Sequence, residues 1–310
     1  MIDIKLLEQL CLCNGISGDE GNVRNLIINE IKDCADDIKT DNLGNLIVFK
    51  KGKKSAKSKL MVSAHMDEVG LMVTDITSDG YLKFDEVGGI DRRVLPGKRV
   101  CVGRNGLNGV IGVKPIHLTN GDEKTAVPKM NDMYIDIGAE SREDALKYVN
   151  YGDGINFEGD FKINSKTVVT LDDRFGCYVL INLIKSEPEY DMYFTFVVQE
   201  EVGLRGARPA AFTVNPDFAL VIESTTAADV AEVDASHQVC NLSKGATVTV
   251  MDRATVYDTE MISAAFELAE KNNISVQYKR AVAGGNDSGA IHQSRGGVRT
   301  LAVSLPSRYI

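Results

Sequence analysis

Lys59-Leu60-Met61-Val62-Ser63-Ala64 is an apolar, strand-like run, and it is followed directly by His65 and, two residues later, by Asp67. The same feature recurs further along the chain, where the apolar runs at 193–199 and 218–222 lead into acidic residues: Glu200, Glu201 and Glu223. Open α/β sheets bind their ligands beyond the carboxyl ends of their strands. The sequence therefore predicts an α/β fold with one imidazole and several carboxylates at one edge of its sheet.

The middle of the chain has a different texture. From Gly70 to Phe161, short alternating runs are separated by frequent turn signals, and one short helix is expected near 141–148. This pattern is typical of a small β-barrel or sandwich. Strands and helices alternate after this region, which indicates a mixed or parallel sheet with helices on its faces. We therefore expect a discontinuous α/β catalytic domain at 1–69 and 162–310, interrupted by an inserted small β-barrel domain at 70–161.

Several elements can be placed from local patterns. Ser17-Gly18-Asp19-Glu20 has the spacing of a capping box, and it predicts a helix that runs to about Ala35. Apolar stripes predict two further helices, at 174–185 and 259–271. Strands are expected at 192–198, 217–223, 246–251, 275–280 and 299–304.

Composition excludes several classes of function. The 310 residues include 44 acids and 35 bases, giving a formal net charge of -9, which argues against a nucleic-acid partner. No apolar stretch approaches the ~20 residues of a membrane helix, and the first residues do not resemble a signal peptide. The six cysteines are dispersed and form no Cys-x-x-Cys pair, so free thiols in a reducing cytoplasm are expected.

His65 and Asp67 can act as a pair. Residues two apart at a strand end face the same side. His65 could then bind a divalent metal such as zinc, cobalt or manganese while the Asp67 carboxylate orients its ring. A His-x-Asp pair is short enough to occur by chance, so an ordinary polar strand end is the competing interpretation.

Asp172 begins a predicted helix, in the run Asp172-Asp173-Arg174. An acid at that position can simply cap the helix. The alternative is a carboxylate that bridges the two metals of a dinuclear site. The two interpretations are about equally consistent with the local sequence.

Glu200 and Glu201 follow an apolar strand, where two adjacent carboxylates are costly to bury unless a cation compensates them. One can ligate a metal while its neighbour acts as a general base. Glu223 also follows an apolar strand, where it is either a ligand or a solvated strand end. The loop at 284–289 is glycine-rich and fits a backbone wall of a substrate pocket better than a phosphate site.

Taken together, these residues resemble the dinuclear-metal aminopeptidases that assemble as tetrahedral particles, named glutamyl or deblocking aminopeptidases and sometimes labelled endoglucanases. The resemblance covers essentially the whole chain. It is carried by the following stretches: Ser63 to Gly70, Gly88 to Asp91, Ile111 to His117, Leu171 to Gly176, Val198 to Ala207 and Gly284 to His292.

The resemblance implies a role for each candidate residue. His65 would bind one of two divalent ions, most often zinc or cobalt, with Asp67 behind it as the orienting acid. Asp172 would bridge both ions, Glu201 would ligate one, and Glu200 would be the general base that activates water. Glu223 occupies the place of a further ligand that is usually aspartate. The substrate would be a peptide with a free α-amine, and the inserted β domain would be the dimerisation domain of a dodecamer.

One expected ligand is not among these 310 residues. The family has a histidine just after an Arg-Tyr-x run, and here Arg308-Tyr309-Ile310 ends the sequence. Either residues follow Ile310, or one ion lacks its imidazole; His292 is the substitute considered. The competing hypotheses are an amidase or glycosidase, although the chain has no Trp and only 6% aromatic residues for stacking sugars, and an inactive particle-forming scaffold.

Overall fold

The computed structural model describes residues 2–163 and 172–310, so Leu171 of the motif at 171–176 lies outside the described residues. The chain divides into two compact units. The first comprises Met1–Cys13, Glu20–Asp67 and Asp160–Ile310, and the second comprises Asn14–Asp19 and Glu68–Gly159. The boundaries thus fall within two residues of those expected at 69/70 and 161/162, and residues 14–19 join the second unit.

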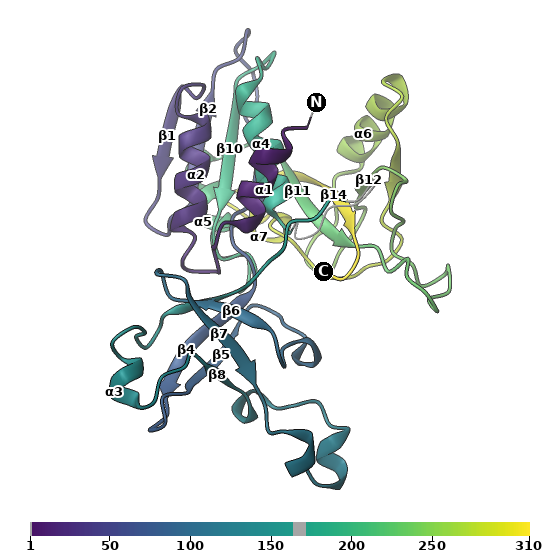
Figure 1. Ribbon diagram of the computed structural model, residues 1–310. Helices are drawn as coiled ribbons and strands as arrows, with labels where there is room; N and C mark the ends of the chain where they lie inside the picture. The colour runs from purple at the N-terminus through teal and green to yellow at the C-terminus, as the bar shows by residue number, and fades with distance from the viewer. Residues whose placement is uncertain (1, 164–171) are drawn as a thin grey trace. The chain divides into compact units, whose positions relative to one another are not determined.

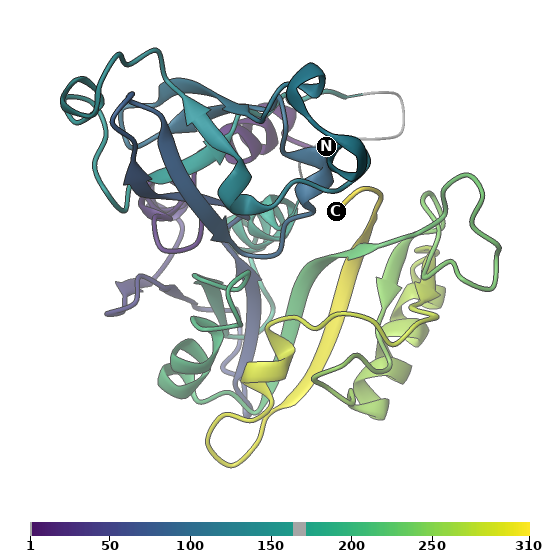
Figure 2. The ribbon, with the colours of Figure 1, turned by 90° about the horizontal axis from the view of Figure 1, so that it is seen from below.

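The first unit contains an eight-stranded mixed sheet (Figure 1). Its central four strands run parallel to one another, and in Figure 2 β14 (yellow) lies beside β11 (green). In sheet order the strands are β1 (Asp37–Thr40), β2 (Leu46–Lys50), β10 (Met192–Val197), β3 (Leu60–His65), β11 (Phe218–Thr226), β14 (Arg299–Ser307), β12 (Ala246–Val248) and β13 (Val276–Tyr278).

Helices pack on both faces of this sheet, because the side chains of its strands alternate between two apolar clusters. Val62 and Ala64 of β3 belong to a cluster that contains residues of α1 (Ile4–Leu12), α2 (Gly21–Ile31) and α4 (Arg174–Lys185). Met61 belongs to the cluster on the opposite face. That cluster contains residues of α5 (Ala207–Val214), α6 (Thr259–Lys271) and α7 (Ser288–Ile291). The predicted α/β architecture is confirmed.

The second unit is a closed barrel of six antiparallel strands around its own apolar core, which confirms the predicted inserted barrel. In barrel order the strands are β4 (Gly70–Ile76), β5 (Leu82–Val87), β8 (Tyr134–Asp136), β7 (Leu107–Gly112), β6 (Arg99–Val102) and β9 (Gly154–Phe157). Its short helices are α3 (Arg142–Ala145) and four 3₁₀ turns, η1 (Arg92–Val94), η2 (Ile116–Leu118), η3 (Gly121–Lys124) and η4 (Met130–Asp132).

One local prediction was wrong. The helix expected to begin at the capping box has Glu20, not Ser17, as its N-cap residue, and the Glu20 side chain makes no capping hydrogen bond. The helix runs from Gly21 to Ile31. Among the described residues, no helix combines the length and apolar character that crossing a membrane requires.

Candidate metal and catalytic site

The registers of three parallel strands bring the predicted site residues together. His65, the last residue of β3, pairs with Val197 at the end of β10. On the other side of β3, Ser63 pairs with Val221 of β11. Glu223 lies two residues further along and therefore comes level with His65 on the same side of the sheet. The carboxyl ends of β10 and β3 thus lie beside Glu223, which is inside β11, because that strand continues to Thr226 instead of ending at 223 as predicted.

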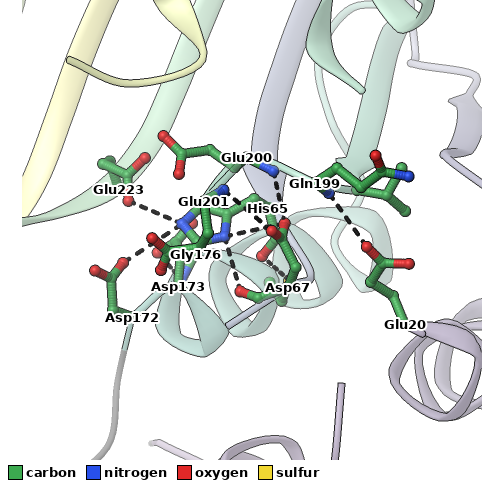
Figure 3. Close-up of polar contacts among 12 residues, drawn as sticks. Glu20, His65, Asp67, Asp172, Asp173, Gly176, Gln199, Glu200, Glu201 and Glu223 are labelled. Atoms are coloured by element: carbon green, nitrogen blue, oxygen red, sulfur yellow. Dashed lines mark hydrogen bonds and ion pairs between the residues drawn. The ribbon is translucent and has the colours of Figure 1, made fainter. Parts of the chain in front are cut away.

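His65 lies at the centre of this edge (Figure 3). Its ring is only 2% exposed. Nδ1 lies 2.9 Å from the backbone oxygen of Asp67, and Nε2 lies 3.5 Å from Asp172 Oδ1 and 3.4 Å from Glu223 Oε1. Because a carbonyl oxygen can only accept, Nδ1 must donate, and in the neutral ring Nε2 carries the lone pair that a metal binds.

Asp67 holds the backbone of the two adjacent glutamates. Its carboxylate is fully buried and accepts from the amide of Glu200 at 3.0 Å and from that of Glu201 at 3.1 Å. The Asp67 Oδ1 atom lies 3.5 Å from His65 Nδ1, whereas the Asp67 backbone oxygen lies 2.9 Å from the same nitrogen. Asp67 therefore contacts the ring mainly through its main chain, while its carboxylate fixes the start of the glutamate loop (Figure 3).

Asp172 does not cap the helix that follows it. The N-cap of α4 is Asp173, whose Oδ1 accepts from the Gly176 amide at 3.0 Å. The peptide bond between Asp172 and Asp173 is cis. Of the two interpretations left open by the sequence, the structure removes the capping role and leaves the Asp172 carboxylate beside His65. Asp173, which the sequence interpretation did not select, is fully buried at the same edge.

The residues present fit divalent metal ions. Ligand atoms of His65, Glu200 and Glu201 lie within 4.8 Å of one another, and so do those of His65, Asp173 and Glu223. Several buried carboxylate oxygens have no hydrogen-bond partner among the described residues: Asp172 Oδ1, Asp173 Oδ2, Glu223 Oε2 and both oxygens of Asp287. One imidazole nitrogen with several carboxylate oxygens is a donor set that suits zinc or cobalt.

The electrostatics of the edge favour added positive charge. Burial raises the pKa of Glu200 to about 10 and that of Glu201 to about 7, and neighbouring acids add to both shifts. Burial by itself lowers the pKa of His65, but Glu223, Asp172 and Asp67 outweigh it and the net pKa is raised. Because the carboxylates repel one another in a dry environment, a bound cation is what stabilises their ionised forms.

Asp287 was also missed. It precedes α7 within the glycine-rich loop, is fully buried, and its pKa is raised well above the ordinary range by burial and by neighbouring acids of the site, although His65 opposes the shift. The available signal was an acid inside a glycine-rich loop, which had been interpreted only as a backbone wall. His292, considered as a substitute ligand, directs Nδ1 to the Ser288 backbone oxygen at 2.8 Å.

Comparison with known proteins agrees with this geometry. The family model for M42 glutamyl aminopeptidase matches residues 44–310. A provisionally named aminopeptidase of Acetivibrio thermocellus is 43% identical, over 98% of this chain and 90% of its own length. The structure of a TET aminopeptidase from a marine-sediment thaumarchaeon has a TM-score of 0.94 at 32% identity, covering 99% of this chain and 89% of that one.

A further solved relative is the TET1 peptidase of Pyrococcus horikoshii, which can assemble into a tetrahedron or a large octahedral shell. It is 40% identical with a TM-score of 0.87, covering 99% of this chain and 92% of that one. The predicted enzyme class, a peptide hydrolase of the metalloaminopeptidase type, is confirmed by these matches. The chain belongs to the M42 glutamyl aminopeptidase family.

Proposed function

We propose that this protein removes N-terminal residues from peptides at a site that holds two divalent metal ions, zinc or cobalt. The observation that carries the proposal is the position of His65 Nε2 within 3.5 Å of two carboxylates from different segments, Asp172 and Glu223, with Glu200 and Glu201 beside the same ring. In this proposal His65 and Glu223 would hold one ion, Glu201 would hold the other, and Asp172 would be a ligand shared by both.

Each component has a defined task. The bound ions supply Lewis acidity toward the scissile carbonyl and lower the pKa of water. Glu200 takes a proton from the attacking water as the C–O bond forms, and it delivers that proton to the leaving amine as the C–N bond breaks. In the metal-free site, burial raises the pKa of this half-buried carboxyl to about 10. Bound cations would favour the ionised form, which takes the proton from water, while the buried position helps the carboxyl to hold that proton until the amine leaves. Asp67 keeps Glu200 and Glu201 in place through their amides.

The Glu200→Gln variant tests the assignment of the proton carrier. Turnover of aminoacyl-p-nitroanilides should fall by about 10²–10⁴-fold, because the amide keeps the shape of the side chain but cannot carry the proton. Two ions per chain should still be found by elemental analysis, since Glu200 is not assigned as a ligand. Glu267→Gln, the same change at an exposed position of α6, is the matched control and should leave turnover unchanged.

Substrate class is tested on the wild-type protein with the same preparation. Aminoacyl-p-nitroanilides should be cleaved, whereas cellulose and N-acylated amino acids should not. Retained peptide cleavage in Glu200→Gln would remove Glu200 from the reaction. Cleavage of only the acylated or sugar substrates would overturn the aminopeptidase proposal itself.

We also propose a homo-oligomer built through the barrel unit, with twelve chains in the complete particle. The family match and the assembly of the Pyrococcus horikoshii relative support this proposal. The barrel unit also exposes large apolar side chains, which is typical of a surface that is covered in an assembly. They include Val94, Ile116, Leu118 and Val127, all more than half exposed.

A further inference from the structure

We infer that Asn45 and Glu20, which lie outside the proposed metal site, are positioning residues for Glu200 and Glu201. The inference rests on the proposed function, which gives Glu200 and Glu201 their roles. Both residues act on the loop at 198–206, which follows the end of β10 and carries the two glutamates.

Four consecutive amides of this loop are held by side chains from three distant segments. Val198 N donates to Asn45 Oδ1 at 2.9 Å, and Gln199 N donates to Glu20 Oε1 at 3.2 Å. The next two amides, those of Glu200 and Glu201, donate to the Asp67 carboxylate. Figure 3 shows Glu20 reaching Gln199 on one side and Asp67 reaching the glutamates on the other. The loop has left the sheet ladder, so these side chains replace the missing strand partner.

Asn45 also closes the far end of the loop. Its Nδ2 donates to the Gly206 backbone oxygen at 2.9 Å, while the Gly206 amide donates to the Val198 oxygen at 3.0 Å. One fully buried side chain therefore joins the first and last residues of the loop. The approach is close enough to require glycine, because a Cβ at Gly206 would lie 2.4 Å from Asn45 Oδ1.

Asn45 is itself fixed by the turn that precedes β2. Its Nδ2 donates a second hydrogen bond to Asp41 Oδ2 at 2.7 Å. The other carboxylate oxygen of Asp41 accepts from the amides of Leu43, Gly44 and Asn45. Asn45 thus uses its acceptor on Val198 and both its donors on oxygens, and only an amide of this length supplies both functions.

The loop also needs external support because of its backbone. Gln199 has a φ of +57°, a left-handed conformation that non-glycine residues hold only where their surroundings determine it. The Glu20 carboxylate, only 3% exposed at the N-cap of α2, contacts the amide of this same residue. Glu20 and Asn45 together therefore set the direction in which the following glutamates leave the sheet.

Four variants test this inference. Asn45→Ala and Glu20→Ala remove the contacts. Asn45→Asp keeps the acceptor for Val198 but turns a carboxylate oxygen toward the oxygens of Gly206 and Asp41. We expect kcat to fall about 10–100-fold in these three with KM within about twofold, because small displacements of reacting groups are that costly. Glu20→Gln keeps an acceptor for Gln199 and should retain most of the activity.

Two further measurements separate positioning from general stability. The control Val23→Ala removes buried volume from α2 but none of the hydrogen bonds that hold the loop, so it should lower the thermal midpoint and leave kcat unchanged. Hydrogen exchange of the amides at 198–206 should be at least about tenfold faster in Asn45→Ala and Glu20→Ala than in the wild type or in Val23→Ala.

The outcomes distinguish this inference from the proposed function. Unchanged exchange at 198–206, or unchanged kcat in Asn45→Asp and Glu20→Ala, overturns the positioning roles while wild-type aminopeptidase activity stands. If kcat falls in Val23→Ala as much as in the Asn45 and Glu20 variants, the kcat losses come from general destabilisation. That result also overturns the positioning roles. If exchange at 198–206 is faster in Asn45→Ala and Glu20→Ala but the wild type cleaves no aminoacyl substrate, Asn45 and Glu20 do support the loop. The proposed function is then wrong instead.

Discussion

At the scale of single residues, the site depends on two separate groups of Asp67, its backbone oxygen and its carboxylate. Its backbone oxygen accepts from the His65 ring at 2.9 Å, and its carboxylate accepts from two consecutive amides. A fully buried carboxylate with two amide donors is compensated by those hydrogen bonds. The same residue therefore fixes both the tautomer of the imidazole and the position of the glutamate pair.

Asp67→Asn should separate these two tasks. The backbone contact to His65 survives, but one of the amides of Glu200 and Glu201 then faces an NH₂ group instead of an acceptor. We expect kcat to fall about 10–100-fold, with a smaller loss of metal, as is typical of groups that orient ligands. Steady-state kinetics and elemental analysis measure the two effects. Wild-type kcat in this variant would show that the carboxylate has no part in placing the glutamates.

Metal uptake should release protons. In the metal-free site, burial raises the pKa of the Glu201 carboxyl to about 7, and neighbouring acids outweigh burial and raise the pKa of the His65 ring, so these ligands must lose protons before they bind a cation. Zinc affinity should therefore rise between about pH 6 and pH 8. Calorimetric titration at pH 6.5 in two buffers with different heats of ionisation counts the protons released. A count of zero would contradict the raised pKa values.

The raised pKa values of Glu200 and Glu201 also determine how the stability of the metal-free protein changes with pH. Both glutamates bind protons more tightly in the folded chain than at the ordinary value of 4.5, so the folded state gains protons relative to the unfolded state. The contribution of the two glutamates to stability is then fully present below about pH 4.5 and falls as pH rises toward 7. Denaturant unfolding of the metal-free protein across this range should show the decline, and zinc should reverse it.

The sequence placed Asp172, Glu200, Glu201 and Glu223 near His65, but it missed the buried acids Asp173 and Asp287 and did not predict what each acid contacts. Runs that end in His65, Glu200 and Glu223 are visible because strand polarity alone places their ends at one edge. The choice between Asp172 and Asp173 as helix cap could not be made, because both are acids at a helix start. Glu20 was interpreted as part of a capping box. Its actual contact is with the amide of Gln199, 179 residues away, and the local sequence around Glu20 could not predict it.

At the scale of elements, strongly periodic segments were predicted to the residue. The helices α4 and α6 have the predicted bounds, because each begins with an acidic cap and carries an apolar stripe. Segments without such signals were missed. The strand β1 is short and mostly exposed, and α5 contains Pro209 within its first turn. In these cases tertiary packing, rather than local preference, decides the structure.

The start of α6 gives a prediction for element stability. Asp258 caps this helix by accepting from the Met261 amide, and it pairs with Arg299 of β14, with Oδ2 and Nε 2.6 Å apart. Asp258→Ala removes both contacts and should lower the free energy of unfolding by about 1 kcal/mol. Asp258→Asn keeps the cap and should cost less. Denaturant unfolding at constant metal concentration measures both, and equal losses would show that the cap contributes nothing.

The pH dependence of this contact has the opposite sign to that of the metal site. The hydrogen bond from Arg299 lowers the pKa of Asp258 to about 2. The ion pair therefore stabilises the folded state above the ordinary value of 3.8, and the contribution is lost as pH falls toward 2. Because the pair is largely solvated, its share should be small beside that of the cap.

At the scale of the whole molecule, assembly is the property to test. Twelve chains of 33.8 kDa would give a particle of about 400 kDa. Ile116, 70% exposed in η2 of the barrel unit, is a large apolar side chain for which burial in an interface would be favourable. Ile116→Glu would place a charge in such an interface, and burying an unpaired charge is costly. Light scattering should then show a mass of two chains or fewer.

Lys124→Glu is the matched control for the assembly experiment. It adds negative charge to an exposed position of the same connecting segment without removing an apolar side chain, so the particle should keep its mass. If Ile116→Glu also leaves the mass unchanged, the η2 segment is not part of an interface. If the wild type itself has the mass of one chain, the proposed assembly is wrong, and the exposed apolar side chains of the barrel unit require another partner.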